Sequence, residues 1–150
     1  MPYCIVQYVN HATTANTGFL LAKATQRWNE LLLERFRAAG FPEVRASYGS
    51  VLLPLFEQDG QRMGEIGRRA RLSKPSMTAL VRQCESDGLV RRERDPADGR
   101  AFRVVLTARG RRFGEVAEEV LRELDGLVAA RLGREEVDAL ARGLKGVMDL

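Results

Sequence analysis

The sequence predicts a mainly α-helical protein with a small β-hairpin, and two observations support this, while a third excludes a membrane span. Apolar residues recur at steps of three and four along most of the 150-residue chain, as in helices with one buried face. Between residues 89 and 106 the period changes to two, which is typical of strands. The longest apolar run, residues 51–56, is too short to cross a bilayer. We therefore expect an α+β fold with about six helices and two or three strands.

Two amphipathic helices are expected in the first part of the chain. Residues 18–39 have helical apolar spacing, and Gly40 directly after them is a helix-stop residue. A second apolar stretch covers residues 48–58 and ends at the turn around Gly60. Pro54 lies inside this stretch. Because an interior proline removes a backbone donor and crowds the preceding turn, we expect a kink or a late start there.

Residues 63–87 predict two helices joined by a tight turn. In the first, residues 63–72, the side chains expected to face inward are Ile66, Ala70 and Leu72. Ser73 then supplies an N-cap oxygen, and Pro75 occupies the first turn of the next helix, where its missing donor costs nothing. The inward stripe of that helix is Met77, Leu80, Val81 and Cys84. Its small, polar outward face near the N-terminus is typical of a helix-turn-helix motif.

A basic hairpin and two long helices complete the chain. Residues 89–94 and 101–106 predict two strands, with residues 95–100 as the turn between them. Thr107 caps a helix over residues 108–132, which would be about 37 Å long at the usual rise per residue. After Gly133, a last helix carries the apolar stripe Val137, Leu140, Ala141, Leu144, Val147 and Met148.

Positive charge is concentrated in the middle of the chain. Although the net charge is only +4, residues 62–112 hold fourteen basic and six acidic residues, a local net charge of +8. Of the 24 basic residues, 21 are arginines, whose planar fork suits phosphate and guanine. Charge of this kind favours a nucleic-acid partner. The alternatives are a solvated basic face or a genome whose high GC content favours Arg codons.

Enzymatic and metal functions find no support in the sequence. It has no phosphate-binding Gly-Lys-Ser/Thr loop and no Gly-x-Ser-x-Gly elbow, so we expect no enzyme activity and no cofactor. His11 is the only histidine, which excludes a His-rich zinc site. Cys84 lies on an apolar stripe and Cys4 in an undefined segment, so redox sensing is unsupported. The first residues do not resemble a secretory signal, and a cytoplasmic location is expected.

The central residues resemble the multiple-antibiotic-resistance regulator (MarR) family of winged helix-turn-helix transcription factors. The matching segments are Glu65-Ile66, Ser73 to Val81, Glu85 to Arg92, Asp95 to Arg100 and Val105 to Gly110. They resemble the family's scaffold helix, recognition helix, wing and return strand. Asp98-Gly99-Arg100 is similar to the Asp-x-Arg ending of the wing. Three residues depart from the family pattern: Met63 where Ser or Thr usually opens the scaffold helix, Gly67 and Cys84.

This resemblance implies a division of the chain into three parts within one compact domain. Residues 1–44 would form an N-terminal arm and a dimerisation helix, and residues 45–107 a winged helix-turn-helix DNA-binding lobe. Residues 108–150 would form C-terminal dimerisation helices. Their apolar seams are wider than a winged core needs, which suggests an obligate homodimer. The alternative is that these helices fold back on their own subunit.

The function implied by the resemblance is sequence-specific regulation of transcription. Such a homodimer would bind a pseudo-palindromic operator in double-stranded DNA and act as a repressor released by a small lipophilic or phenolic effector. The alternative from another class is an interaction module whose basic face docks an acidic protein without sequence-specific DNA binding. That alternative predicts no preference among duplex sequences.

Candidate sites follow from the expected position of each element. The expected DNA-binding residues are Ser73, Lys74, Pro75, Ser76, Thr78, Arg82, Arg92, Arg94, Asp98, Arg100 and Arg103. Among them, Lys74 and Arg82 are the main candidates for base contacts, and Arg100 for the minor groove. Arg100 could instead pair with Asp98 and brace the turn. The expected effector pocket consists of Trp28, Phe36, Tyr48 and Leu52. The alternative, which is favoured for each of them taken singly, is a plain core residue.

Overall fold

A computed structural model of the chain describes residues 16–150, so Cys4 and His11 lie outside the described residues. The α-helices are α2 (Thr17–Ala38), α3 (Gly49–Glu57), α4 (Met63–Ala70), α5 (Lys74–Ser86), α6 (Ala108–Leu132) and α7 (Arg134–Met148). The other elements are the 3₁₀ turn η1 (Ala46–Tyr48) and the strands β1 (Gln61–Arg62), β2 (Val90–Asp95) and β3 (Asp98–Leu106). The predicted α+β fold is confirmed.

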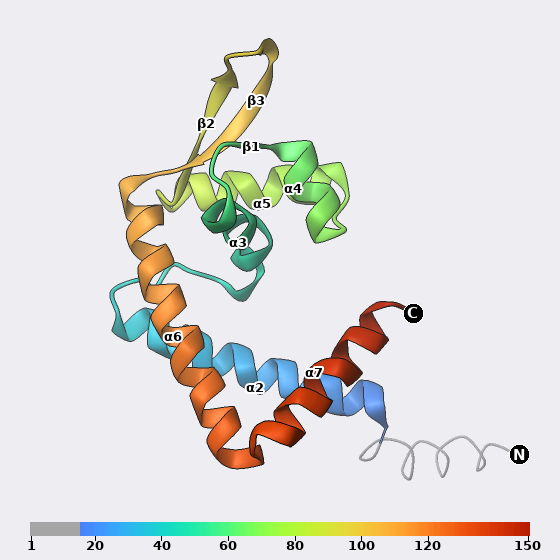
Figure 1. Cartoon of the computed structure of the whole chain (residues 1–150). Coiled ribbons are helices and arrows are strands. Elements are labelled where there is room, and N and C mark those ends of the chain that lie inside the picture. Colours follow the sequence, from blue (N-terminus) through green and yellow to red (C-terminus); the bar gives the residue numbers. More distant parts are fainter. Residues whose placement is uncertain (1–15) are drawn as a thin grey trace, which may run out of the picture.

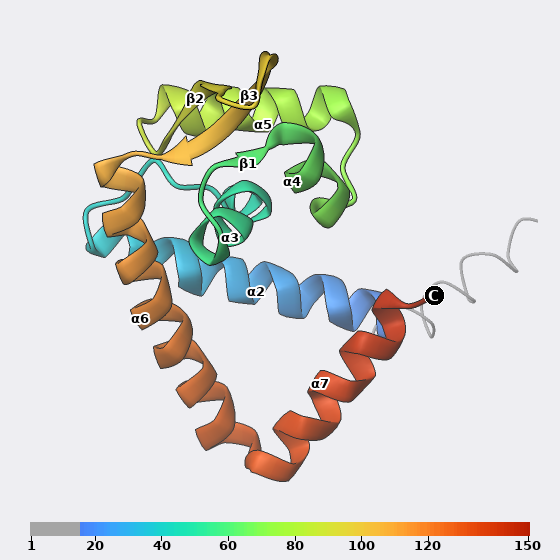
Figure 2. The ribbon, with the colours of Figure 1, turned by 45° about the horizontal axis from the view of Figure 1, so that its top comes forward.

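The elements separate into two ends. Figures 1 and 2 show α5 and the β2–β3 hairpin at one end, and the α6–α7 corner at the other. Helix α6 leads away from the hairpin, and helix α2 crosses α6 (Figure 1). No helix among residues 16–150 is long and apolar enough to span a bilayer.

The helix caps predicted from the sequence are present. Ser73 has extended backbone, and its hydroxyl accepts a hydrogen bond from the Ser76 amide at 3.3 Å. Thr107 in the same way accepts one from the Gly110 amide at 3.0 Å. Helix α5 ends at Ser86 with Asp87 as its C-cap, and Gly88 then adopts a φ of +75° that favours glycine.

The three strands form one antiparallel sheet in the order β1-β3-β2. The predicted six-residue turn at 95–100 is wrong, because residues 98–100 belong to β3 and only Pro96 and Ala97 remain in the turn. Two aspartates explain the tighter turn. Asp95 accepts a hydrogen bond from the Ala97 amide at 2.9 Å, and Asp98 accepts one from the Arg100 amide at 3.1 Å.

Helix α4 begins at Met63 as predicted but ends two residues earlier than predicted. It ends at Ala70 because Arg71 adopts the left-handed conformation, with φ +53°. Leu72 therefore leaves the helical face and is 37% exposed, so its predicted inward position is wrong. The N-cap is Arg62, whose amide donates to the Glu65 carboxylate at 3.1 Å. This bond supplies part of the capping that the Met63 position lacks.

Helix α3 contains Pro54 as an interior residue. It begins at Gly49, directly after η1, so of the two expected outcomes the late start does not occur. Because proline lacks one backbone N–H, Pro54 removes a single helical bond, the one toward the Ser50 carbonyl. The Pro54 carbonyl accepts from the Gln58 amide and from the buried Gln61 side chain, which closes the end of the helix.

A continuous core joins the winged lobe to the upper part of α6. Fully buried side chains include Val51, Leu55, Ile66, Val81 and Leu89. Each such side chain contributes roughly 1.5–3 kcal/mol relative to an exposed position. The rings of Phe36 in α2 and Phe113 in α6 meet edge to face at 4.9 Å, which places α2 on this core.

Candidate nucleic-acid interface and effector pocket

The N-terminal half of α5 presents a polar, cationic surface. Ser73, Lys74, Pro75 and Ser76 are exposed there. Arg82 is exposed one and a half turns further along the helix. Among residues 16–150, neither Lys74 nor Arg82 has a carboxylate within salt-bridge distance. Both charges therefore remain available to a partner.

Thr78 occupies a different environment from its neighbours on α5. It is half-buried, and its hydroxyl donates to the Lys74 carbonyl at 2.9 Å. This hydroxyl is therefore engaged by the backbone of its own helix, unlike the exposed side chains that precede it.

The tip of the β2–β3 hairpin carries one free arginine and one engaged arginine. Arg94 donates to the Gly99 carbonyl at 2.9 Å and lies 5.8 Å from the centre of the Phe102 ring, so it braces the hairpin. Arg100 is exposed. Asp98 binds the backbone amide of Arg100, and no side-chain pair between the two occurs in the described structure. The Arg100 guanidinium is thus free to contact a partner.

Two further arginines from the predicted interface are held by the protein. Arg92 donates from Nε to the Glu85 carboxylate at 3.0 Å, which ties β2 to α5. Arg103 is half-buried; its guanidinium faces Gly60, and its buried Nε has no hydrogen-bond partner in the described structure. Arg103 therefore lies in the middle of the sheet, where Arg62 of β1 and Glu93 of β2 flank it.

An ion pair anchors the turn end of the hairpin. The Arg62 Nε donates to the Asp95 carboxylate at 2.7 Å, and this links β1 to the end of β2. The hydrogen bond from the Ala97 amide, followed by the one from Arg62, lowers the pKa of Asp95 below its ordinary value. Sequence analysis missed this pair because the two residues are 33 positions apart.

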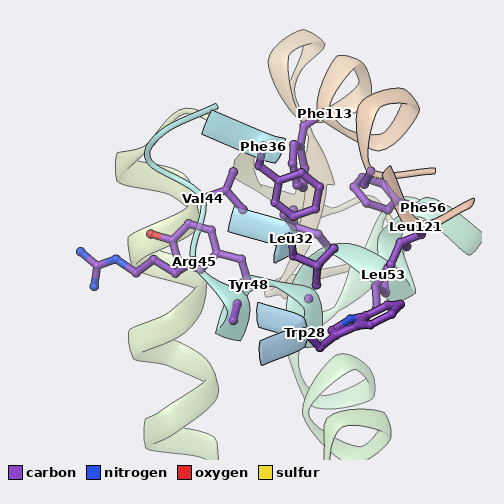
Figure 3. A pocket seen from close by; sticks show the side chains of 14 residues that line it. Trp28, Leu32, Phe36, Val44, Arg45, Tyr48, Leu53, Phe56, Phe113 and Leu121 are labelled. Carbon is purple, nitrogen blue, oxygen red and sulfur yellow. The ribbon is translucent and has the colours of Figure 1, made fainter. Parts of the chain in front are cut away.

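The four predicted effector residues line a single cavity of about 170 Å³ (Figure 3). The structure adds wall residues that the sequence did not bring together with them. These include Leu32 from α2, Arg45, Leu53 and Phe56 around α3, and Phe113 and Leu121 from α6. Figure 3 shows Trp28, Phe36, Phe56 and Phe113 around this space. The two α6 residues belong to the apolar stripe that the sequence predicts for that helix. The sequence did not indicate which other elements this stripe would contact.

The hydroxyl of Tyr48 already has a hydrogen-bond partner within the protein. The side chain is 1% exposed, and its hydroxyl donates to the Asp87 carboxylate at 2.5 Å. Burial, together with this hydrogen bond, raises the pKa of Tyr48 above its ordinary value. Trp28 by contrast is only half-buried, at the wall formed by α2.

Cys84 is fully enclosed on the inner side of α5. Burial raises the pKa of its thiol to about 12, which keeps it protonated and unreactive at neutral pH. Within residues 16–150, no group of three or more His, Cys, Asp or Glu residues is placed to hold a metal ion.

Comparison with known proteins assigns the chain to a family. The MarR family pattern matches residues 51–101, from α3 into the hairpin. The HTH-type transcriptional repressor Rv2887 of Mycobacterium tuberculosis is 34% identical over 110 residues, which cover 67% of this chain and 79% of Rv2887. The chain belongs to the MarR family. The resemblance predicted from the central segments is confirmed.

Two solved structures share this fold over most of the chain. The transcriptional repressor CouR, bound to a 23-mer DNA duplex, superposes with a TM-score of 0.78 and 26% identity, covering 91% of this chain and 95% of CouR. Rv2887 in complex with salicylic acid superposes with a TM-score of 0.62 and 27% identity, covering 91% of this chain and 98% of Rv2887. The winged helix-turn-helix architecture of this MarR family regulator is therefore established.

Proposed function

We propose that this MarR family regulator is a homodimeric repressor that binds a pseudo-palindromic DNA duplex and is released by a small aromatic effector. The observation that carries the proposal is the placement of free cations. Lys74 and Arg82 on α5 and Arg100 on the hairpin are exposed, lack carboxylate partners among residues 16–150, and belong to elements at the same end of the molecule (Figure 2).

Helix α5 is proposed to enter the major groove. Its exposed N-terminal residues are the ones that a recognition helix delivers to base edges. Arg82 suits bidentate bonding to guanine, and Lys74 can reach guanine or phosphate. Ser73 and the free amides of the first turn can bind a phosphate, which the helix dipole favours. The support from outside this chain is CouR, whose structure holds a DNA duplex.

The hairpin is proposed to act as the wing on the minor groove. Arg100 is free at the tip, where the narrow groove of A·T-rich DNA concentrates negative potential. Arg92 and Arg94 lie on exposed strand positions and are proposed to contact phosphates, with Glu85 and Gly99 holding them in place. Arg103, half-buried beside Gly60, supports the sheet and is proposed to add charge rather than a direct contact.

A homodimer is proposed because α7 leaves its apolar stripe uncovered. Leu140, Leu144 and Val147 are each at least 39% exposed, and α7 has no buried residue. One recognition helix reads only a few base pairs, so a two-fold dimer with half-sites about one helical turn apart doubles the contact. Such a dimer would cover this stripe with the second chain.

A small aromatic compound is the proposed effector class. The 170 Å³ cavity is walled mainly by aromatic and aliphatic side chains, and the exposed Arg45 at its edge can pair with an acidic substituent. Rv2887 has been solved with salicylic acid, a compound of this class. An effector would release the DNA only if it bound more tightly to one arrangement of the two recognition helices in the dimer than to another.

The decisive experiment compares two arginine variants on DNA. Duplexes are first selected from fragmented genomic DNA, and binding is then measured for Arg82→Ala and Arg92→Ala on selected and random duplexes over a range of salt. We expect Arg82→Ala to weaken specific binding by roughly 1–3 kcal/mol and to relax base preference. Arg92→Ala should weaken all duplexes alike and reduce the salt slope by about one.

Two results would contradict the proposal. Equal effects of both variants on selected and random duplexes would exclude major-groove recognition by α5. Binding without any preference among duplexes, together with saturable binding to an acidic protein, would favour the interaction module instead. Arg122→Ala is the control, since Arg122 is exposed on α6 and paired with Glu118, away from α5 and the hairpin.

A further inference from the structure

One hydrogen bond joins the cavity to the end of helix α5. Tyr48 contributes to the cavity wall, and its hydroxyl reaches out of the cavity to the Asp87 carboxylate at 2.5 Å. The two residues belong to segments 39 positions apart, η1 and the α5 terminus. Because Tyr48 is 1% exposed, water does not compete freely for this bond.

Asp87 occupies a position that controls the last turn of α5. It is the C-cap residue, and its amide donates to the Gln83 carbonyl at 3.0 Å. Gly88 then turns the chain, and the buried Leu89 leads directly into β2. A displacement of Asp87 would consequently act on both the proposed recognition helix and the first residue of the wing.

The same turn is fixed from the other side by α6. Thr107 donates from its hydroxyl to the Gly88 carbonyl at 2.6 Å, and its amide donates to the Leu89 carbonyl at 3.1 Å. These bonds involve the backbone next to the cap and do not line the cavity. Tyr48 is thus the cavity residue whose side chain is hydrogen-bonded to the α5 terminus in the described structure.

The hydroxyl of Tyr48 is committed to Asp87, so an occupant of the cavity would meet the ring of Tyr48. Ala46 and Gly49, on either side of it in the chain, also line the cavity, and the 3₁₀ turn η1 carries the ring on a short segment. An aromatic group that displaces the ring would stretch or break the bond to Asp87.

We propose that Tyr48 is a positioning residue that holds the C-terminal turn of α5 through Asp87 and releases it when an aromatic group occupies the cavity. The proposal rests on the proposed function, because it assigns the route by which an effector reaches the DNA-binding surface. Coupling of this kind requires α5 to have two positions. The occupant of the cavity must bind more tightly to the protein with α5 in one of them than in the other.

The first test removes the hydroxyl and keeps the ring. In Tyr48→Phe, amide hydrogen exchange of residues 84–90 should lose protection by roughly ten-fold, the scale of a lost hydrogen bond to a charged group. Trp28→Phe is the matched control, since it alters an aromatic wall residue that does not contact Asp87. Unchanged protection at residues 84–90 in Tyr48→Phe, or the same loss in the control, would overturn the proposal.

The second test places a defined group in the cavity. A cysteine is introduced by Ala46→Cys together with Cys4→Ser and is labelled with benzyl methanethiosulfonate; the buried Cys84 stays unreactive. We expect the benzyl group to raise exchange at residues 84–90 by several-fold when Tyr48 is present, and to add nothing when Tyr48→Phe is also made. An equal rise in both proteins, or none in the first, would overturn the proposal.

These measurements separate the proposal from the proposed function. Hydrogen exchange reports on the α5 terminus without DNA, so the link between cavity and helix is tested even if no preferred duplex exists. If the exchange results are as expected and no duplex is preferred, the positioning role stands and the assignment as a DNA-binding repressor falls. If both hold, the benzyl label should also weaken binding to the selected duplex.

Discussion

The winged lobe and helix α7 carry similar apolar stripes but bury them to different extents. In the lobe, Ile66 and Val81 are fully buried by neighbouring elements of the same chain. In α7, Leu140 is 46% exposed and Leu144 is 39% exposed. The comparison shows that periodicity identifies the side chains that need cover and does not identify what covers them. For α7, the cover proposed here is a second copy of the chain.

The largest expected effect is a charge placed in the α7 stripe. Leu144→Asp would bury a carboxylate in the proposed dimer interface, so we expect the dimer to weaken by about 1,000-fold, or about 4 kcal/mol. The winged lobe should keep its helical content, because α7 contributes no buried residue to it. Sedimentation equilibrium and circular dichroism measure the two effects.

The control for this variant adds the same charge to the opposite face of α7. Ala139→Asp lies about half a turn from the centre of the apolar stripe, and it should leave the association unchanged. If the dimer dissociation constant were the same for Leu144→Asp and Ala139→Asp, the proposal that a second chain covers the apolar stripe of α7 would be wrong.

A smaller effect is expected at the junction between the two regions. Gly110 lies in the first turn of α6, where an added Cβ would come within 2.0 Å of the Leu89 carbonyl oxygen. Since both the helix and the α5–β2 turn would have to move, Gly110→Ala should lower the free energy of unfolding by about 3 kcal/mol. Urea unfolding at a fixed protein concentration measures this change.

Gly126 in the same helix provides the matched control. No atom lies within 4 Å of the Cβ that Gly126→Ala would introduce. That variant should be neutral or should stabilise the helix by up to about 1 kcal/mol. A loss of stability in Gly110→Ala no larger than in Gly126→Ala would show that α6 is not in tight contact with the winged lobe.

The smallest effect concerns the Arg62–Asp95 pair at the turn end of the hairpin and depends on pH. Because the pKa of Asp95 is lowered in the folded protein, its stabilising contribution is present above the unfolded pKa, near 4, and is lost as pH falls through the folded value. Wild type should therefore exceed Asp95→Asn in stability at pH 7, and the difference should shrink below about pH 4. A difference that is the same at pH 3 and pH 7 would contradict this role of the Arg62–Asp95 pair.

Local features of the fold could be predicted because their causes lie within a few residues. The N-caps Ser73 and Thr107 bind amides three residues away. Helix α6 begins and ends where Thr107 and Gly133 predicted. The turn was predicted too long because Asp95 and Asp98 each bind an amide two positions on, which tightens it.

The candidate sites were predicted less completely. Lys74, Arg82 and Arg100 are exposed, as a helix period and a hairpin tip indicate. Which arginines are free, however, depends on how neighbouring elements pack, since Arg92 on β2 is held by Glu85 on α5 and Arg94 on β2 by the Gly99 carbonyl on β3. The same holds for the Tyr48–Asp87 bond, whose residues are separated by most of the winged lobe.

The sequence by itself determined the helices, the caps, the hairpin and the concentration of positive charge, because these depend on side-chain period and on hydrogen bonds between near neighbours. Only the tertiary structure decided which charges stay free, which residues enclose the cavity and which bond connects it to α5. Those features depend on contacts between separate helices and strands, and such contacts exist only after the core has closed around them.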